Sequence, residues 1–548
     1  MTLAETQTRA TATDLPPERQ GDNLLDGDVA LLEGIRREGA AAFEDDCRDL
    51  GATLGGAEAI RWGFEANDHP PAIERHDRSG EHVDEIRFHP AWHDLMQLSV
   101  EHGVTGVPWA DDRPGAHVAR AARFIMVAQV EAGITCPLAM TYSCVPALRL
   151  TPEAAGLWEP LVTSGVYDPR PLPAREKDAA LIGMALTERG GGSDVRTGTR
   201  TTATPAGDGT WVLDGAKWFV SAAQSDAFFL LGRTGDGISL FLVPRLTDEG
   251  ALNGLYFDRL KDKLGNRSNP TAEVEVRGAR GILIGEEGRG VRAIMEMIGG
   301  TRHDCVLGST AVMRLGTAEA IHWARNRPAF GRDLADQPAM TAVLADLALE
   351  SEAATAGALR LARANEASHR GDEQAELLRR IAAPVLKYWT CKRAPQHAAE
   401  ALECQGGFGY IENSRLARGY REAPLMSVWE GSGNVQALDV LRALDREPDV
   451  LEALLTEIDA GAGANALLDA EAAALRDPSL TAGGEASARL LAGRLARALQ
   501  ASLLVRGAPD AVADAFCATR LGAESGRTFG ELPTGLDLEA IVARALPA

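Results

Sequence analysis

Hydrophobic positions along the chain follow a helical period in its N-terminal part, lose that period in the middle and regain it afterwards. In the middle, short alternating or apolar runs are separated by glycine-containing turns, which is typical of an antiparallel β-domain. The final segment is rich in Ala and Leu and predicts an additional helical module. Helical segments on both sides of the strands do not favour a parallel βαβ sheet, so the predicted fold class is α+β, mainly α. The predicted domains are 1–182, 183–295, 296–445 and 446–548.

Two local patterns illustrate this division. In 117–133, the residues Val118, Ala122 and Ile125 recur at helical spacing and predict an amphipathic helix. In the middle segment, Gly and Asp predict turns between the runs TWVLDGAKWFVSA, DAFFLLGRT and ISLFLVPR. The predicted turns are 207–209, 214–215 and 235–237.

Composition narrows the range of functions. At 548 residues the chain exceeds what one hydrophobic core usually serves. Its 78 Asp and Glu outweigh 56 Lys and Arg, and the net charge of −22 disfavours nucleic-acid binding unless a local basic face exists. The seven cysteines form no C-x-x-C pair, so neither a disulfide framework nor a metal site is predicted. No apolar run reaches the roughly 18 residues that cross a bilayer, and no secretory signal is recognisable, so we expect a cytoplasmic protein without membrane contact.

The segment 184–200, MALTERGGGSDVRTGTR, is the first candidate for cofactor binding. Its three consecutive glycines let backbone N–H groups approach a ligand closely. Thr187 and Ser193 supply hydroxyls that can donate hydrogen bonds to a flavin ring or its phosphates. The same sequence fits an ordinary surface loop, so this segment alone leaves both interpretations open.

Two further segments carry candidate chemistry. The run KWFVS at 217–221 predicts a strand with Phe219 and Ser221 on one face, where they could line a flat ring. An ordinary strand with one solvent-exposed face fits the same run equally well. Glu430 lies in a Glu-Gly-Ser-Gly turn before a helix that is predicted to begin near Asn434. A carboxylate in that position can act as a base, or it can merely interact with the helix dipole.

Taken together, these segments resemble the acyl-CoA dehydrogenase superfamily. Residues 185–196 follow its first signature, and residues 403–422, ECQGGFGYIENSRLARGYRE, fit its second. The Arg-x-x-Phe-Gly of 327–331 resembles the segment that reaches the FAD pyrophosphate of a neighbouring subunit. The resemblance implies an N-terminal helical domain, a middle β-barrel and a C-terminal helical bundle, here followed by an extra C-terminal helical domain.

The resemblance also implies FAD as the cofactor and an oligomer, a homotetramer in the family, whose subunits share the FAD site. The residues that it assigns to FAD lie in separate segments of the chain. They are Met184, Ala185, Leu186, Thr187, Gly192, Ser193, Phe219, Val220, Ser221, Arg327, Phe330, Gly406, Gly407, Val428, Trp429, Gly431, Ser432, Gly433 and Asn434.

The reaction implied by the resemblance is α,β-desaturation of an acyl-CoA. A base removes the α-proton while the β-hydrogen leaves as hydride to flavin N5, and Glu430 matches the position of that base. Some family members place the base at the position of Thr301 instead, where this chain has no acid. Arg302 is assigned to substrate binding, although Gly299 stands where acyl-CoA-oxidising relatives often carry an acidic residue that holds pantetheine. The family usually passes its electrons to an electron-transfer flavoprotein.

Rival hypotheses remain open. The segments 261–269 and 428–444 are similar to the alkylation-response branch of the superfamily, so a second hypothesis is a flavoprotein that binds or protects DNA and has little acyl-CoA activity. Arg489, Arg494 and Arg497 gather on one predicted helix, but acidic residues outnumber arginines in 446–548, and a solvated helix face fits better than a DNA site. A third hypothesis is a nitroalkane-type flavin oxidase, which commonly uses a carboxylate of different length.

Overall fold

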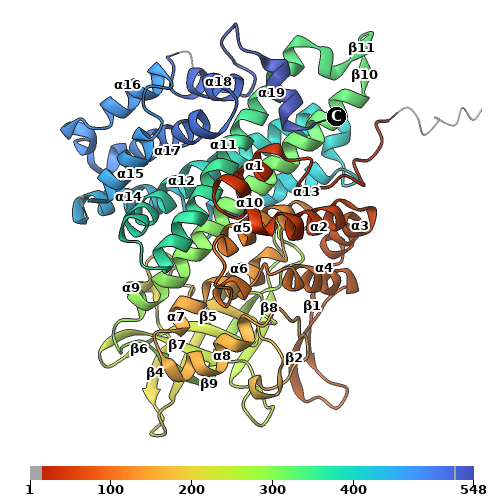
Figure 1. Ribbon diagram of the computed structural model, residues 1–548. Coiled ribbons are helices and arrows are strands. Elements are labelled where there is room, and N and C mark those ends of the chain that lie inside the picture. The colour runs from red at the N-terminus through yellow and green to blue at the C-terminus, as the bar shows by residue number, and fades with distance from the viewer. Residues whose placement is uncertain (1–14, 448, 524–525, 548) are drawn as a thin grey trace, which may run out of the picture.

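The computed structural model describes residues 15–447, 449–523 and 526–547. Figure 1 shows a β-domain at one end, a bundle of long helices in the centre and a group of shorter C-terminal helices at the other end. The N-terminal helices pack along one side of the bundle. This arrangement confirms the predicted fold class, including the middle barrel and the extra C-terminal helices.

The N-terminal region is helical with one interruption. Its helices are α1 (Val29–Arg37), α2 (Glu44–Gly55), α3 (Ala57–Asp68), α4 (Pro90–Glu101), α5 (Ala116–Val130), α6 (Thr135–Ser143), α7 (Val145–Leu148) and α8 (Pro152–Val162). An antiparallel hairpin of β1 (Ala72–His76) and β2 (His82–Arg87) interrupts them, which the sequence pattern did not predict. The helix predicted at 117–133 forms as α5, but all its residues are buried because other helices enclose it. It has no solvent-exposed face and is therefore not amphipathic in the folded protein.

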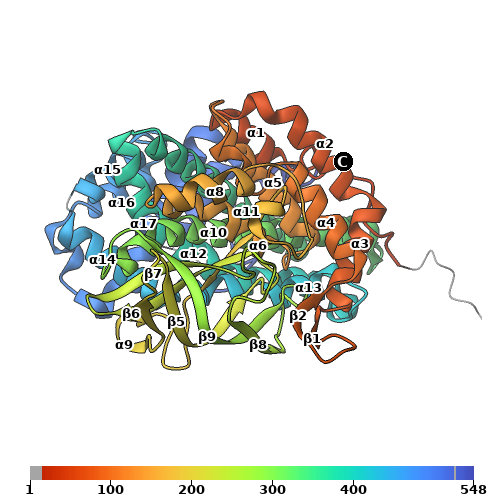
Figure 2. The ribbon, with the colours of Figure 1, turned by 90° about the horizontal axis from the view of Figure 1, so that it is seen from below.

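The β-domain is a closed ring of strands. It consists of β3 (Ile182–Ala185), α9 (Val195–Gly198), β4 (Thr202–Pro205), β5 (Trp211–Ser221), β6 (Ala227–Thr234), β7 (Gly237–Pro244), β8 (Leu255–Leu260) and β9 (Thr271–Ile284). The order β6-β4-β5-β9-β7 closes on itself because β7 also pairs with β6, while β3 adds in parallel to β6 and β8 pairs with β9. Figure 2 shows these strands from below, with β5 beside β9.

One predicted turn in this domain is wrong. The turns at 207–209 and 235–237 join β4 to β5 and β6 to β7, as predicted. Asp214 and Gly215 instead lie inside β5, beside a register shift between Leu213 and Asp214. A Cβ on Gly215 would lie 2.4 Å from Oγ1 of Thr201, so glycine is needed here for close packing and not for a turn.

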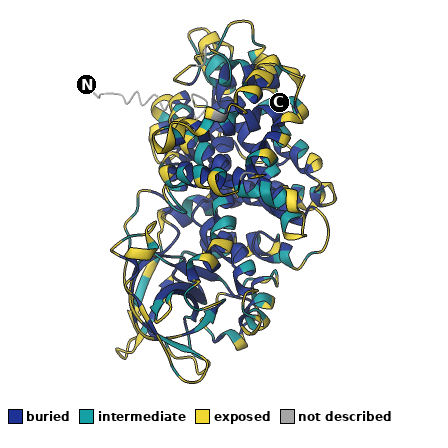
Figure 3. Ribbon diagram, turned by 90° about the vertical axis from the view of Figure 1, so that its left-hand side faces the viewer, coloured by how far each residue is buried: buried dark blue, intermediate teal, exposed yellow. Residues whose placement is uncertain are grey.

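The centre of the molecule is built on three long helices. They are α10 (Gly290–Asn326), α11 (Pro338–His369) and α12 (Glu373–Cys404), and the short strands β10 (Pro328–Ala329) and β11 (Arg332–Asp333) lie between α10 and α11. The bundle continues with α13 (Arg415–Glu422) and α14 (Gly433–Arg446), and the C-terminal helices are α15 (Asp449–Asp459), α16 (Ala466–Ala474), α17 (Gly484–Gly507), α18 (Asp510–Arg520) and α19 (Leu538–Ala545). One hydrophobic cluster runs from the N-terminal helices through the bundle into α17 and α18. Figure 3 shows this buried interior, with exposed residues at the rim.

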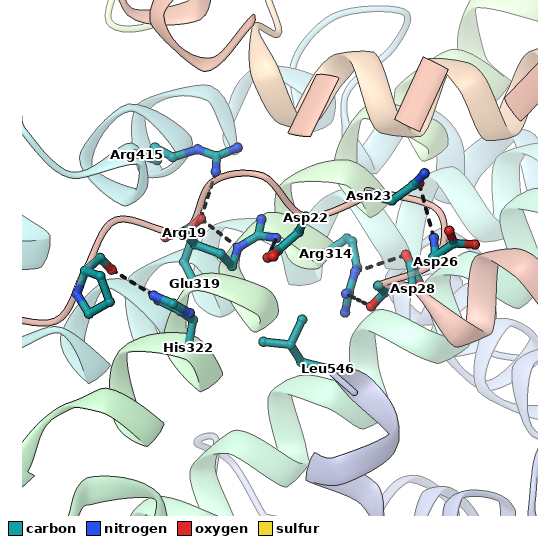
Figure 4. A network of polar contacts seen from close by, with 12 residues as sticks. Arg19, Asp22, Asn23, Asp26, Asp28, Arg314, Glu319, His322, Arg415 and Leu546 are labelled. Carbon is teal, nitrogen blue, oxygen red and sulfur yellow. Dashed lines mark hydrogen bonds and ion pairs between the residues drawn. The ribbon is translucent and has the colours of Figure 1, made fainter. Parts of the chain in front are cut away.

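Both ends of the described chain are fixed to α10. Figure 4 shows the contacts of the N-terminal segment with Arg314 and Glu319. Arg314, which is buried on α10, donates hydrogen bonds of 2.6 Å to the carbonyl oxygens of Gly27 and Ala545 and forms an ion pair of 3.0 Å with Asp28. Arg19 and Arg415 pair with Glu319 further along the same helix. All seven cysteines are buried and free. Within the described ranges, no helix is both long and apolar enough to cross a membrane.

Candidate active site

Glu430 lies on a sharply bent loop between a 3-10 turn, Leu425–Ser427, and the start of α14. Its backbone has φ of 56° and that of Gly431 has φ of 94°, so two successive residues adopt the left-handed conformation. For a residue other than glycine this conformation is strained by about 1–2 kcal/mol. The loop must therefore be held by its surroundings.

The carboxylate of Glu430 faces α10. The Thr301 hydroxyl donates a hydrogen bond of 2.9 Å to Oε2 of Glu430. Burial raises the pKa of Glu430, while the Thr301 hydrogen bond and the cations of Lys387 and Arg302 lower it. The net effect is a raised pKa, as expected of a general base, because desolvation makes the carboxylate more basic and the nearby donors offset only part of that rise.

Side-chain donors hold the backbone carbonyls of this loop. Lys387, on α12, donates to the carbonyls of Trp429 and Gly431 at 2.9 and 2.8 Å. Gln436 Nε2 donates to the Glu430 carbonyl at 3.0 Å, and Arg302 Nε approaches the same oxygen at 3.3 Å. Arg302, predicted to bind substrate, also pairs with Asp439 at 2.8 Å and so lies against the loop.

The first signature forms the end of β3 and the loop after it. Met184 and Ala185 end the strand, and the predicted residues Leu186, Thr187, Gly192 and Ser193 follow. A Cβ on Gly192 would lie 3.0 Å from Oγ1 of Thr187, so the loop folds back onto the threonine. Gly192 and Ser193 are exposed and remain accessible to a ligand.

A buried ion pair that the sequence analysis missed fastens this loop to β5. Lys217 Nζ donates to Oε1 of Glu188 at 2.6 Å, and both side chains are almost fully buried. Glu188 also accepts hydrogen bonds from Thr201 Oγ1 at 2.7 Å and Arg200 N at 2.7 Å. A lysine within the otherwise β-forming run WVLDGAKWFVS is the sequence signal that could have revealed it.

The end of β5 presents the predicted strand residues. Val220 is buried, whereas Phe219 keeps 49% of its surface exposed. The hydroxyls of Ser221 and Thr271 lie 3.2 Å apart. Lys261 Nζ lies 3.2 Å from the ring centre of Trp218 and 4.8 Å from that of Phe219.

These segments meet in one place. Trp429 packs against a hydrophobic cluster to which Met184 and Ala222 belong and which Leu186 also borders. The first-signature segment, the residue after β5 and the Glu430 loop thus border one hydrophobic cluster, and Ser432, Gly433 and Asn434 follow at the start of α14. Nε1 of Trp429 is buried without a hydrogen-bond partner among the described residues, and Val428 is 65% exposed. An unpaired indole donor and open apolar side chains beside a folded-back glycine loop fit a planar ring with hydrogen-bonding edges.

The remaining predicted cofactor residues lie elsewhere in the same chain. Arg327 follows the C-terminal end of α10, and Phe330 is 96% exposed in the adjoining hairpin. Gly406 and Gly407 begin the 3-10 helix Gly406–Tyr410, whose Phe408 stacks on Trp323 of α10 at 4.8 Å. Thr301 and Trp323 are 22 residues apart on this helix, which at 1.5 Å per residue is about 33 Å. One chain therefore presents two groups of predicted cofactor residues at opposite ends of α10.

The C-terminal arginines are engaged by protein groups. Arg494 makes two hydrogen bonds to Glu471, at 2.8 and 3.1 Å. Arg497 lies 5.0 Å above the ring of Trp389, and Arg489 lies 5.8 Å from the ring of Tyr388. The three side chains thus contact the protein's own surface and do not converge on one open face.

Comparisons with known proteins agree with this geometry. Residues 14–169 match the N-terminal domain of the adaptive response protein AidB, residues 183–279 match the middle domain of acyl-CoA dehydrogenases, and residues 288–444 match their C-terminal domain. AidB of Escherichia coli (strain K12) is 46% identical over 81% of this chain and 82% of its own length. Acyl-CoA dehydrogenase family member 11 of Caenorhabditis elegans is 33% identical over 72% of this chain and 66% of its own.

Solved structures show the same fold over almost the whole chain. The Caenorhabditis elegans protein ACDH-11, solved in complex with C11-CoA, superposes with a TM-score of 0.85 at 27% identity and covers 96% of this chain and 95% of its own. A second structure, described as the apo-form of Bd2924, has a TM-score of 0.80 at 28% identity and covers 89% of this chain and 98% of its own.

Proposed function

Because the chain belongs to the acyl-CoA dehydrogenase family and carries the AidB N-terminal domain, we propose that it is an FAD-dependent oxidoreductase that desaturates an acyl-CoA between its α and β carbons. The observation that carries the proposal is the Glu430 carboxylate, which is held on a strained loop and accepts a hydrogen bond from Thr301. Its neighbour Trp429 packs against the same hydrophobic cluster as Met184 and Leu186. The base in this proposal is Glu430.

The residues that would hold FAD fall into the two groups described above. At the Glu430 end, Thr187, Ser193, Ser221 and backbone groups of the glycine loop would bond the ring system and the phosphates, and Phe219 and Trp429 would cover its apolar parts. When bound, FAD would supply the acceptor for the hydride that leaves the β-carbon. The chain's own residues must then orient the substrate and remove the other hydrogen as a proton.

Glu430 would take the α-proton on Oε1 or Oε2. Its raised pKa brings its basicity closer to neutral pH, where a carboxylate transfers protons most effectively. Negative charge develops on the thioester oxygen as the proton leaves, and a positioned N–H donor would stabilise it. The Glu430 N–H donates to no acceptor within the described residues, so it is available for that task.

The separation of the two groups supports an oligomer. A second copy that placed its Arg327, Phe330 and Gly406 segments against the Glu430 end would complete the FAD site, as the family resemblance implies. The exposed apolar side chains at those segments, Phe330 at 96% and Tyr410 at 82%, favour burial by another chain. We propose a homotetramer that shares its FAD sites and delivers electrons to an electron-transfer flavoprotein.

The decisive experiment is anaerobic mixing of the FAD-loaded protein with short, branched and long acyl-CoAs while flavin absorbance near 450 nm is followed. Bleaching by one class of acyl-CoA, lost in Glu430→Gln with FAD content and folding preserved, is the expected result. Full bleaching by Glu430→Gln would eliminate Glu430 as the base. Rapid reoxidation of the bleached flavin by air would indicate an oxidase in place of a dehydrogenase.

The match to the N-terminal domain of an adaptive response protein favours a second candidate, a flavoprotein that protects DNA and has little acyl-CoA activity. The net charge of −22 and the engaged C-terminal arginines argue against a broad DNA-binding face. A DNA titration across salt, run on the same preparation, separates the two. Salt-dependent DNA binding without bleaching by any acyl-CoA would favour the second candidate.

A further inference from the structure

Lys387 is a buried cation without a carboxylate partner. Its exposed fraction is 1%, and none of the ion pairs among the described residues includes it. Lys177 and Lys217, which are also buried, differ in this respect because they pair with Asp226 at 2.8 Å and with Glu188 at 2.6 Å. Burying an unpaired ammonium is costly, so the groups around Lys387 must compensate for the lost hydration.

The compensation comes from the loop that carries Glu430. An ammonium group has three N–H donors. Those of Lys387 donate to the carbonyl oxygens of Met426 at 3.2 Å, Trp429 at 2.9 Å and Gly431 at 2.8 Å. Two of these carbonyls belong to the residues on either side of Glu430.

This contact acts on the strained part of the loop. Glu430 and Gly431 both have positive φ, and a non-glycine residue holds such a conformation only when surrounding groups over-determine it. By binding the carbonyls of Trp429 and Gly431, one rigidly placed ammonium fixes the orientation of the 429–430 and 431–432 peptide groups. Lys387 sits on α12, in the core of the bundle, so the anchor itself has little freedom.

The same cation acts electrostatically on the Glu430 carboxylate. Lys387 favours the ionised form of Glu430 and lowers its pKa against the effect of burial. In a low-dielectric interior this influence extends beyond direct contact, since charge interactions are screened weakly there. The cation is therefore suited both to shape the loop and to offset part of the effect of burial on the pKa of Glu430.

We infer that Lys387 is a positioning residue for the proposed reaction: through three carbonyl contacts it holds the Glu430 loop in its strained form. This inference rests on the proposed role of Glu430 as base. It extends that proposal by assigning part of the catalytic geometry to a lysine that touches neither substrate nor cofactor.

The test compares Lys387→Met with Lys392→Met in the FAD-loaded protein. Lys392 is exposed on the same helix, and a Cβ built on Gly433 would lie 2.6 Å from its Cε. Replacing Lys392 therefore removes a positive charge near the same loop and leaves the carbonyl contacts of Lys387 intact. In Lys387→Met, we expect the maximal rate of acyl-CoA-dependent bleaching to fall at least tenfold. The acyl-CoA concentration that gives half of the maximal rate should change little. The pH midpoint of bleaching should move to higher pH, and Lys392→Met should behave as wild type. A Lys387→Met protein with the wild-type rate and midpoint overturns the inference.

Two readouts do not depend on acyl-CoA activity. One is amide hydrogen exchange of residues 425–433, which should accelerate in Lys387→Met and not in Lys392→Met. The other is the infrared band of a protonated carboxyl group, identified by its loss in Glu430→Gln, which should persist to higher pH in Lys387→Met. If no acyl-CoA bleaches the wild-type flavin, the proposed function fails while these two readouts still decide the role of Lys387. Unchanged exchange and an unchanged infrared midpoint would refute that role.

Should Lys387→Met fail to fold, Lys387→Arg decides. Arginine keeps the charge but changes the donor geometry. Faster exchange of residues 425–433 with an unchanged carboxyl midpoint is then expected. Exchange equal to wild type in Lys387→Arg would show that the precise three-carbonyl contact is dispensable and would overturn the inference.

Discussion

Thr301 on α10 and Glu430 on the loop before α14 are joined by a hydrogen bond of 2.9 Å from the threonine hydroxyl to Oε2 of the carboxylate. The sequence resemblance implies that Thr301 stands at an alternative position of the base. In this chain the two positions are neighbours in space. Thr301, which has no acid, donates a hydrogen bond to the carboxylate of Glu430. The hydroxyl stabilises the charged form of Glu430 and is one of the groups that lower its pKa.

Replacing Thr301 with valine should therefore raise the pKa of Glu430 further. A hydrogen bond to a charged group is worth about 1.5–3 kcal/mol, so its loss should favour the protonated form of Glu430. Since the base works when it is deprotonated, the increase of the flavin-bleaching rate with pH should shift to higher pH. Stopped-flow absorbance near 450 nm across pH measures it. Thr301→Ser, which keeps the hydroxyl, should retain the wild-type midpoint, and an unshifted Thr301→Val would contradict the role of this hydrogen bond.

Lys217 and Glu188 should be critical for the stability of the first-signature loop. Lys217→Met leaves the buried carboxylate of Glu188 without its cation, and breaking a buried ion pair in this way costs about 3–5 kcal/mol. We expect a large drop in the midpoint of denaturant unfolding together with loss of bound FAD. The double variant Glu188→Gln with Lys217→Met should recover much of the stability because no uncompensated charge remains. A double variant as unstable as the single one would argue that packing, and not charge, is what matters.

The strand run KWFVS and the position of Glu430 before a helix were predictable because both depend on local order in the sequence. The run KWFVS forms the end of β5, although a register shift between Lys217 and Val220 interrupts its alternation. Glu430 stands in a glycine-rich turn followed by a helical pattern. The hairpin β1–β2 was not predictable in this way. Most of its residues are exposed or only partly buried, so it lacks the apolar alternation that marks a half-buried strand.

Lys387 illustrates a second reason why sequence falls short. In the sequence it is one polar residue within a long helix, where a lysine normally faces water. Its partner Trp429 lies 42 residues further along the chain, and the contact is made to a backbone carbonyl, which every residue possesses. No residue type at the partner position could have indicated it. The division of the cofactor residues between the two ends of α10 was likewise visible only once the length and straight course of that helix were known.

Glu422 should make stability depend on pH. This carboxyl is buried at the junction of α13 with the loop 261–271, where Asn266 N donates to its Oε1 at 2.6 Å. Burial, and then the neighbouring Glu131, raise its pKa from 4.5 to about 7. The folded state therefore keeps a proton between these values that the unfolded state has lost, and stability falls as pH rises through this window, by about 3 kcal/mol in total.

Glu422→Gln removes this titration while keeping an oxygen for the Asn266 N–H. Relative to wild type, its thermal midpoint should be higher at about pH 8 than at about pH 5. The exposed carboxylate of Glu412, paired with Arg421 at 2.6 Å, offers the matched control, and Glu412→Gln should leave the pH dependence unchanged. Parallel curves for wild type and Glu422→Gln would show that Glu422 titrates normally.

Phe330 should link oligomer assembly to FAD retention. Its ring is 96% exposed on a backbone with φ of 53°, next to Arg327 at the end of α10 that lies far from Glu430. If a second chain covers this segment, Phe330→Asp introduces a charge into an apolar contact, and the protein should dissociate and lose flavin on dilution. Arg327→Ala should leave the assembly intact and weaken FAD retention alone, because it removes a donor for the pyrophosphate. Size-exclusion chromatography with light scattering, read together with flavin absorbance, separates the two effects.

The control variant is Leu490→Asp, which places the same charge at an apolar residue that is 65% exposed on α17, away from the predicted FAD segments. It should change neither the mass of the assembly nor the flavin content. An unchanged mass and flavin content in Phe330→Asp would mean that the two halves of the predicted site are not joined through this surface.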